Sequence, residues 1–280
     1  MYIQFLFISW NIDPEIFRIG GFALRYYSLM FLAAFYFSYK ILSKIYTKEN
    51  VPLILLNKLF LYVFVGTVAG ARLGHCLFYE FDYYRHHLLE IILPFRITAK
   101  GQFELTGYQG LASHGGAIGI LIAVWLYCKK YKFSFLWVLD RLVIVVAIAG
   151  MFIRIGNFFN SEIIGKQTNL PWAVVFERVD LIPRHPAQLY EAFCYLLIFF
   201  TVWIIYNKRW RQLKKGFLFG LFLVLLFSVR FMIEFVKENQ ERFENRLLIN
   251  MGQILSIPFI LTGLYFIFKK PTVKPMPGLE

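Results

Sequence analysis

The chain has 280 residues, of which 59% are hydrophobic and 20% aromatic, while only 17% are charged. This balance excludes an ordinary soluble globular domain and predicts an integral membrane protein. The formal net charge of +13 would suit a nucleic-acid-binding protein, but the basic residues are crowded into short loops between apolar runs, which indicates membrane topology and anionic lipid and excludes nucleic acid as a partner.

Apolar runs of about 20 residues, the length that crosses a bilayer, follow one another along most of the chain. The segment before them holds Asp13, Pro14 and Glu15. It lacks a basic start before an apolar core, so we interpret it as a surface lead-in and not as a cleavable signal peptide. We predict an all-α integral membrane protein, a single transmembrane domain over residues 1–280, with about seven transmembrane helices. The expected spans are 22–42, 54–78, 112–129, 136–158, 187–206, 216–236 and 248–268.

Lysine and arginine accumulate in every second loop and in the C-terminal tail. Because short basic loops stay in the cytoplasm, the N-terminus is expected outside and the C-terminus inside. The outside loops 79–111 and 159–186 are longer than a helix hairpin needs, and residues 172–176 form a short alternating run. We therefore expect structured elements in these two loops, a place where function is often found.

Polar residues inside the apolar runs gather near the outer ends of the expected spans. A charged side chain at the bilayer centre costs roughly 3 kcal/mol on insertion scales, so it usually snorkels to the interface or serves a site. Arg154 opens the most polar stretch, and Arg230 lies deep in its span, with Glu234 on the same helical face as its candidate partner. The other polar residues at this level are Tyr27, Arg72, His75, His114, Gln188, Tyr190 and Glu191.

Several of these residues have a purely structural interpretation as well. An arginine can snorkel, a histidine can pack in its neutral form, and tyrosines can form an aromatic belt. Arg72-Leu73-Gly74 followed by Glu80 also has the spacing of Arg154-Ile155-Gly156 followed by Glu162, so an internal repeat is one hypothesis.

The sequence His114-Gly115-Gly116 at the start of span 112–129 has two interpretations. Small residues permit close helix packing. Alternatively, Gly115 and Gly116 let backbone amides approach a phosphate while His114 transfers a proton.

The chemistry that these residues favour is the binding of a phosphate headgroup. Two arginines on different helices form a clamp, because the guanidinium fork fits phosphate oxygens and keeps its charge. The chain has no zinc-protease, nucleophile-elbow or nucleotide-binding motif, and its three cysteines are widely spaced in apolar surroundings, which indicates neither a disulfide framework nor a metal site. A phospholipid substrate, without a metal or another cofactor, is therefore predicted.

The stretch from Arg154 to Gly165 has the pattern RxGNFxNxExxG and resembles the signature of the bacterial prolipoprotein diacylglyceryl transferases. Further similarity to that family lies, in family order, at residues 25–30, 113–116, 184–191 and 230–235. Two positions depart from the pattern. Ser28 stands where glycine is common, and Leu226 stands where some relatives have a tyrosine, which disfavours a mechanism that needs a phenol there.

The resemblance implies an enzyme of the bacterial inner membrane with seven transmembrane helices and an active site toward the periplasm. Such an enzyme moves the diacylglyceryl group of phosphatidylglycerol onto the lipobox cysteine thiol of a prolipoprotein and releases glycerol phosphate. By motif position, the residues expected to matter for catalysis are Tyr27, His114, Arg230 and Glu234. The residues expected to bind or shape the phosphatidylglycerol site are Arg154, Asn157, Asn160, Glu162, Gly165, Gly115 and Gly116.

Physical chemistry agrees with this assignment. A thiolate is the nucleophile, and its pKa falls beside positive charge, so an arginine-rich pocket suits both the incoming cysteine and the leaving phosphate. His114 is the first candidate for the proton acceptor, and Arg230, oriented by Glu234, is expected to stabilise the leaving phosphate. The alternative function is a phospholipid transporter or flippase, which inverted repeats and broken helices near the midplane would favour.

Overall fold

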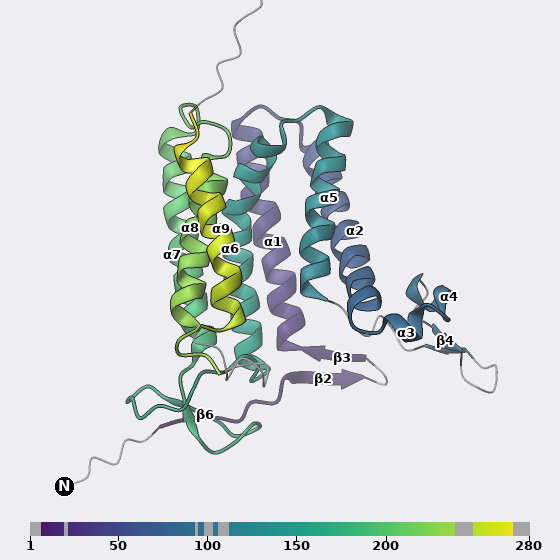
Figure 1. The fold of residues 1–280 in the computed structure, drawn as a ribbon, viewed down its shortest axis with the longest axis vertical. Coiled ribbons are helices and arrows are strands. Elements are labelled where there is room, and N and C mark those ends of the chain that lie inside the picture. Colours follow the sequence, from purple (N-terminus) through teal and green to yellow (C-terminus); the bar gives the residue numbers. More distant parts are fainter. Residues whose placement is uncertain are drawn as a thin grey trace, which may run out of the picture. The chain divides into compact units, whose positions relative to one another are not determined.

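Helices make up most of the protein, and the long ones follow the predicted spans (Figure 1). The computed structural model describes residues 7–19, 22–92, 95–97, 103–105, 112–238 and 249–270. In these residues the long helices are α1 (Tyr26–Lys48), α2 (Leu53–Phe78), α5 (Ser113–Tyr131), α6 (Phe135–Phe159), α7 (Ala187–Arg209), α8 (Phe217–Ile233) and α9 (Met251–Phe268). The short elements are β1 (Ile8–Trp10), β2 (Glu15–Ile19), β3 (Phe22–Arg25), α3 (Phe81–Tyr84), α4 (Leu88–Ile92), β4 (Phe95–Ile97), β5 (Phe103–Leu105), β6 (Val174–Phe176) and β7 (Pro183–Arg184).

The helices have the character of membrane helices. In length and composition, α2, α6, α7 and α9 are each able to cross a membrane, and α8 is apolar but shorter, with 17 residues. A helix suits that environment because it satisfies its backbone hydrogen bonds internally. The count of seven spans and their orientation stay predictions.

Two predicted span ends were wrong. Residues 22–25 form β3, which pairs with β2, so α1 begins only at Tyr26. Residues 234–236 form a turn beyond the end of α8, because their backbone pairs with the loop after α6. In both cases an apolar stretch finds its hydrogen-bond partners outside a helix.

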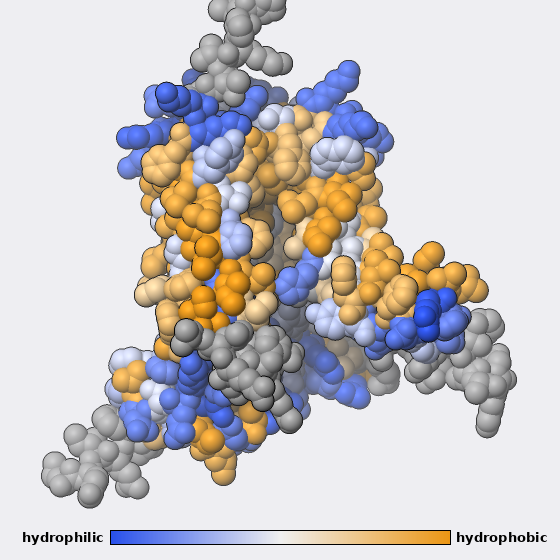
Figure 2. All heavy atoms as spheres, in the orientation of Figure 1, coloured by the Kyte–Doolittle hydropathy of each residue, from blue (hydrophilic) through white to orange (hydrophobic). Residues whose placement is uncertain are grey.

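The outer surface of α7 is apolar and its inner face carries polar residues. Leu189, Phe193, Leu197, Phe200 and Ile204 are exposed at helical spacing. Figure 2 shows apolar side chains over the middle of α8 and α9 and hydrophilic ones at the ends of the helices. This pattern is the reverse of that in a soluble helix and agrees with contact with lipid.

The chain divides into two compact units, residues 1–44 with 139–280, and residues 45–138. The first unit holds a three-stranded sheet in which β6 pairs parallel with β1 and antiparallel with β7. Phe158, Val174 and Phe176 form a buried cluster, against which Trp10 and Ile164 pack. The sheet is thus attached to the end of α6, and β6 lies within the alternating run of residues 172–176.

Asp140 on α6 caps the beginning of α8. Its carboxylate accepts hydrogen bonds from the backbone N–H of Gly216, at 2.7 Å, and from that of Phe219, at 2.9 Å. Gly216 has a φ of 90°, which glycine adopts without strain. A carboxylate at a helix start satisfies free N–H groups and complements the helix dipole.

In the second unit, α2 and α5 cross with their backbones in direct contact. A Cβ atom built on Gly115 would overlap the carbonyl oxygen of Gly70, and one on Gly119 would overlap that of Gly66. Small residues at this spacing are typical of close helix pairs in membranes. The packing interpretation of Gly115 is therefore confirmed.

The close contact between α2 and α5 leads to a first prediction. Gly119→Ala is expected to lower the free energy of unfolding by about 1–3 kcal/mol, because neither backbone can move aside without separating the helices. Gly116→Ala is the matched control, since the nearest atom to a Cβ at Gly116 is 3.6 Å away. Thermal unfolding in detergent should show a lower transition temperature for the Gly119 variant only, and equal transitions would contradict the argument.

Arg72 has a structural role in the same unit. Its Nη2 donates to the carbonyl oxygen of Glu90 at 2.6 Å and its Nε to that of Ile91 at 3.2 Å, while the guanidinium lies 4.8 Å from the centre of the Tyr84 ring. The side chain therefore holds α4, whose last carbonyls need donors. His75 faces Glu80, with 3.6 Å between Nε2 and Oε1.

Candidate functional site

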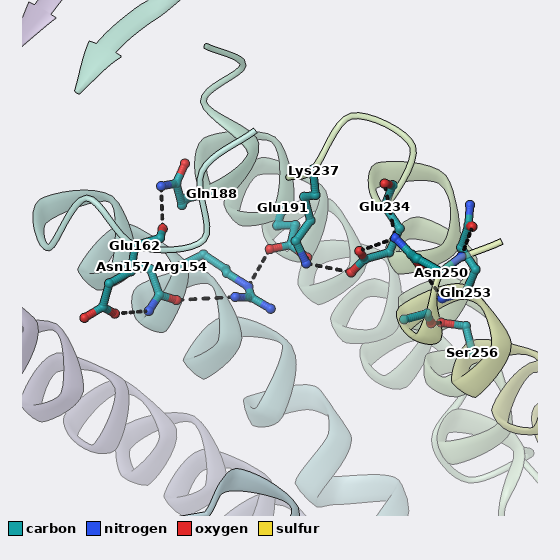
Figure 3. A network of polar contacts seen from close by, with 11 residues as sticks. Arg154, Asn157, Glu162, Gln188, Glu191, Glu234, Lys237, Asn250, Gln253 and Ser256 are labelled. Atoms are coloured by element: carbon teal, nitrogen blue, oxygen red, sulfur yellow. Dashed lines mark hydrogen bonds and ion pairs between the residues drawn. The ribbon is translucent and has the colours of Figure 1, made fainter. Parts of the chain in front are cut away.

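Arg154 is held from two sides near the end of α6. Its Nε lies 2.7 Å from Glu191 Oε2 on α7, and its Nη1 donates to Asn157 Oδ1 at 3.4 Å (Figure 3). The Glu191 side chain is fully buried and that of Arg154 is 12% exposed. A guanidinium carries five N–H groups. Among the described residues, these contacts and an interaction with Tyr195 use only part of the fork, and the rest is available for a ligand.

Glu162 organises the loop that follows α6. Its two carboxylate oxygens accept from Asn157 Nδ2 and Asn160 Nδ2, each at 3.2 Å, and its backbone carbonyl accepts from Gln188 Nε2 at 2.6 Å. In this loop Ser161 and Ile163 have φ values of 56° and 57°. Such a backbone is strained for a β-branched residue and is often found at functional sites.

Gly165 is enclosed by backbone on both sides. A Cβ there would lie 2.5 Å from His185 O and 2.8 Å from Val236 O. The N–H of Gly165 donates to His185 O at 3.0 Å, and the N–H of Lys166 donates to Val236 O at 2.8 Å. The glycine of the signature thus fits because the loop passes between two other segments. Burial lowers the pKa of the His185 imidazole, which favours its neutral form.

Tyr27 lies against the same helix end as Arg154. A Cβ on Gly156 would meet the Tyr27 ring at 2.8 Å, so the ring packs directly on the helix backbone. Arg154 and Glu162 are both within electrostatic range of its hydroxyl. The structure therefore brings Tyr27 together with the signature residues.

Glu234 follows the end of α8 and has partners other than Arg230. Its Oε1 accepts from Lys237 Nζ at 2.6 Å and its Oε2 from Asn250 Nδ2 at 3.0 Å. No carboxylate forms an ion pair with Arg230 among the described residues. Arg230 and Arg154 both act electrostatically on Tyr195. An arginine that is not neutralised by a carboxylate, near a second arginine, is suited to an anionic ligand.

We did not predict Lys237, Asn250 or Gln253 from the sequence. Lys237 and Gln253 are buried, with exposures of 4% and 3%. Asn250 and Gln253 form a capping box at the start of α9, a pattern that the sequence alone could have indicated. Lys237 lies outside the expected span and gave no such signal. The sequence indicated Glu191 as one of the polar residues of the expected spans, but its pairing with Arg154 was not predicted.

His114, Gly115 and Gly116 lie in the second unit, in the first turn of α5. The His114 side chain is exposed. The Gly116 N–H donates to Ala112 O at 3.0 Å, and Gly115 packs on α2. The role of His114 in proton transfer and of the two glycines in binding lipid stay predictions.

Comparison with known proteins shows one family. A sequence model described as prolipoprotein diacylglyceryl transferase matches residues 14–269. A phosphatidylglycerol–prolipoprotein diacylglyceryl transferase of Bacteroides fragilis is 47% identical over 272 residues, which cover 96% of this chain and 98% of the relative. Proteins of the same name from Tolumonas auensis and Chloroherpeton thalassium are 45% and 42% identical, covering 92% and 94% of this chain and 95% and 94% of their own lengths.

Proposed function

Because the chain belongs to the prolipoprotein diacylglyceryl transferase family, we propose that it transfers the diacylglyceryl group of phosphatidylglycerol to the lipobox cysteine of a prolipoprotein. The cysteine sulfur forms a bond to the diacylglyceryl carbon while the bond from that carbon to the phosphate oxygen breaks. The products are a thioether and glycerol phosphate, and the thiol proton passes to a base. The names of the relatives do not support the alternative of a phospholipid transporter.

The observation that carries the assignment of the site is the pair of arginines. Arg154 keeps part of its guanidinium fork available, and Arg230 has no carboxylate partner among the described residues. A phosphate diester would supply the missing negative charge. As the carbon–oxygen bond breaks, the phosphate gains charge, and fixed cations stabilise it more strongly at that point.

The other residues of the signature support Arg154. Asn157, Asn160 and Glu162 form one hydrogen-bonded chain beside it, and Gly165 allows the loop to close. Tyr27 borders the same helix end and Glu234 anchors the segment after α8. By motif position alone, Gly115 and Gly116 are proposed to contact the lipid, and His114 is proposed to accept the thiol proton.

The proposal includes a location. The seven long helices cross the bacterial inner membrane, with the N-terminus in the periplasm and the C-terminus in the cytoplasm, and the site faces the periplasm. Its support is the gathering of lysine and arginine in alternate loops.

The function is tested by mass spectrometry of a lipobox peptide incubated with the purified protein and phosphatidylglycerol in micelles. We expect a diacylglyceryl adduct on the cysteine with phosphatidylglycerol and none with phosphatidylethanolamine, and loss of the adduct in the His114→Ala variant. A well-folded wild-type protein that forms no adduct would refute the function. A fully active His114→Ala variant would refute the role of that residue alone.

A further inference from the structure

Lys237 is a buried lysine between two carboxylates. Only 4% of the residue is exposed. Its Nζ lies 2.6 Å from Glu234 Oε1 and 3.9 Å from Glu191 Oε1. A buried ammonium group is costly unless it is paired, and the two carboxylates supply that pairing.

The backbone of Lys237 is fixed by the loop after α6. Gly165 and Lys237 form an antiparallel bridge, and the N–H of Glu238 donates to Ile164 O at 3.2 Å. Arg184 also connects the loop after α6 with the segment after α8, because its Nη1 donates to Gly165 O at 3.2 Å and to Glu238 Oε2 at 3.0 Å. The ammonium group therefore projects from a segment that is tied to the signature loop.

Glu191 connects this lysine to Arg154. One carboxylate oxygen lies 2.7 Å from Arg154 Nε and the other faces Lys237. The side chains thus alternate in charge, from Arg154 through Glu191 and Lys237 to Glu234, as Figure 3 shows. Neither carboxylate oxygen of Glu191 accepts a hydrogen bond among the described residues. Charge attraction from Arg154 on one side and from Lys237 on the other therefore sets the direction of the carboxylate.

We propose that Lys237 is a positioning residue for diacylglyceryl transfer, which orients the Arg154 guanidinium toward the lipid phosphate by fixing the Glu191 carboxylate. This inference rests on the proposed role of Arg154 in binding that phosphate. A purely structural role for Lys237 would be to neutralise the buried carboxylates of Glu191 and Glu234. Such a role would support the fold but would not affect recognition of the lipid.

The experiment compares kinetic constants of Lys237→Met, Lys237→Arg and Glu191→Gln with those of the wild type. We expect kcat/KM for phosphatidylglycerol to fall by roughly 100-fold in Lys237→Met, the size of effect seen when a binding group is misplaced by about 1 Å. KM for the lipid should rise because Arg154 also binds the phosphate before the reaction, and kcat should fall because the same group stabilises the leaving phosphate. KM for the lipobox peptide should be unchanged. Lys237→Arg should recover most of the lost kcat/KM, and Glu191→Gln should reproduce the loss.

Lys166→Met is the matched control. Lys166 lies in the same paired segment but is exposed, and within the described part of the chain its Nζ donates to a backbone carbonyl, that of Phe235, at 3.0 Å and to no carboxylate. Its KM for the lipid should equal that of the wild type. If Lys237→Met does not fold, KM of Glu191→Gln for the lipid tests the proposal instead, because glutamine keeps the shape of the glutamate side chain.

The outcomes separate the two proposals. A folded Lys237→Met or Glu191→Gln protein with the wild-type KM for phosphatidylglycerol would overturn the role of Lys237 while leaving the transferase function intact. The absence of transfer by the wild type would instead overturn the function itself.

Discussion

Arg154→Met is expected to lower diacylglyceryl transfer by about 100- to 1,000-fold and to destabilise the protein at the same time. Loss of a fixed charge that stabilises a transition state costs about 100- to 1,000-fold in turnover. The stability effect comes from Glu191, which is fully buried, would lose its partner at 2.7 Å and would keep only the more distant Lys237, at 3.9 Å. Breaking a buried ion pair by removing one partner costs about 3–5 kcal/mol.

The two effects can be separated with a double variant. In Arg154→Met/Glu191→Gln the charge left without its partner is removed, so thermal unfolding in detergent should return toward the wild-type transition. The mass-spectrometric assay should still show the loss of transfer. Recovery of transfer together with stability would mean that Arg154 acts only through the fold.

Arg230→Met should lower turnover as strongly as the change at Arg154, but without loss of stability. The reason is that no carboxylate pairs with Arg230 among the described residues, so its removal leaves no buried charge behind. Residues that serve function are often not optimised for stability. We therefore expect the removal of Arg230 to lower activity without lowering the free energy of unfolding.

The measurement is single-turnover transfer beside thermal unfolding, with Arg230→Lys as the control. The lysine keeps the charge but not the planar fork, so it should retain part of the activity. Turnover of Arg230→Met equal to that of the wild type would remove its role with the phosphate, and a large loss of stability would show that it has a structural partner.

The sequence predicted the long helices well because their signal is local. A run of apolar residues long enough for a membrane indicates a helix wherever it occurs, and α2 covers Leu53–Phe78 against a predicted 54–78. The errors lie where pairing with a distant segment decides the backbone, as in β3 and in residues 234–236.

The candidate site was predicted in part for the same reason. The signature from Arg154 to Gly165 is contiguous, so its pattern is visible in the sequence. The partners of its ion pairs are not, since Glu191 and Lys237 come from other segments and their pairing depends on how helices pack. The sequence also could not decide what Gly115 does, because close packing and phosphate binding both require a small residue. The Gly70 carbonyl against it supplies the reason in the structure.

The cap that Asp140 provides for α8 has a consequence for biosynthesis. A chain is made from its N-terminus, so α6 and its carboxylate reach the membrane while Gly216 and Phe219, 76 and 79 residues later, are still to be translated. Until α8 arrives, this acidic group must remain hydrated or bind a temporary donor. We therefore expect α6 to wait in a partly inserted state, and the docking of α8 to be the step that completes its integration into the bilayer.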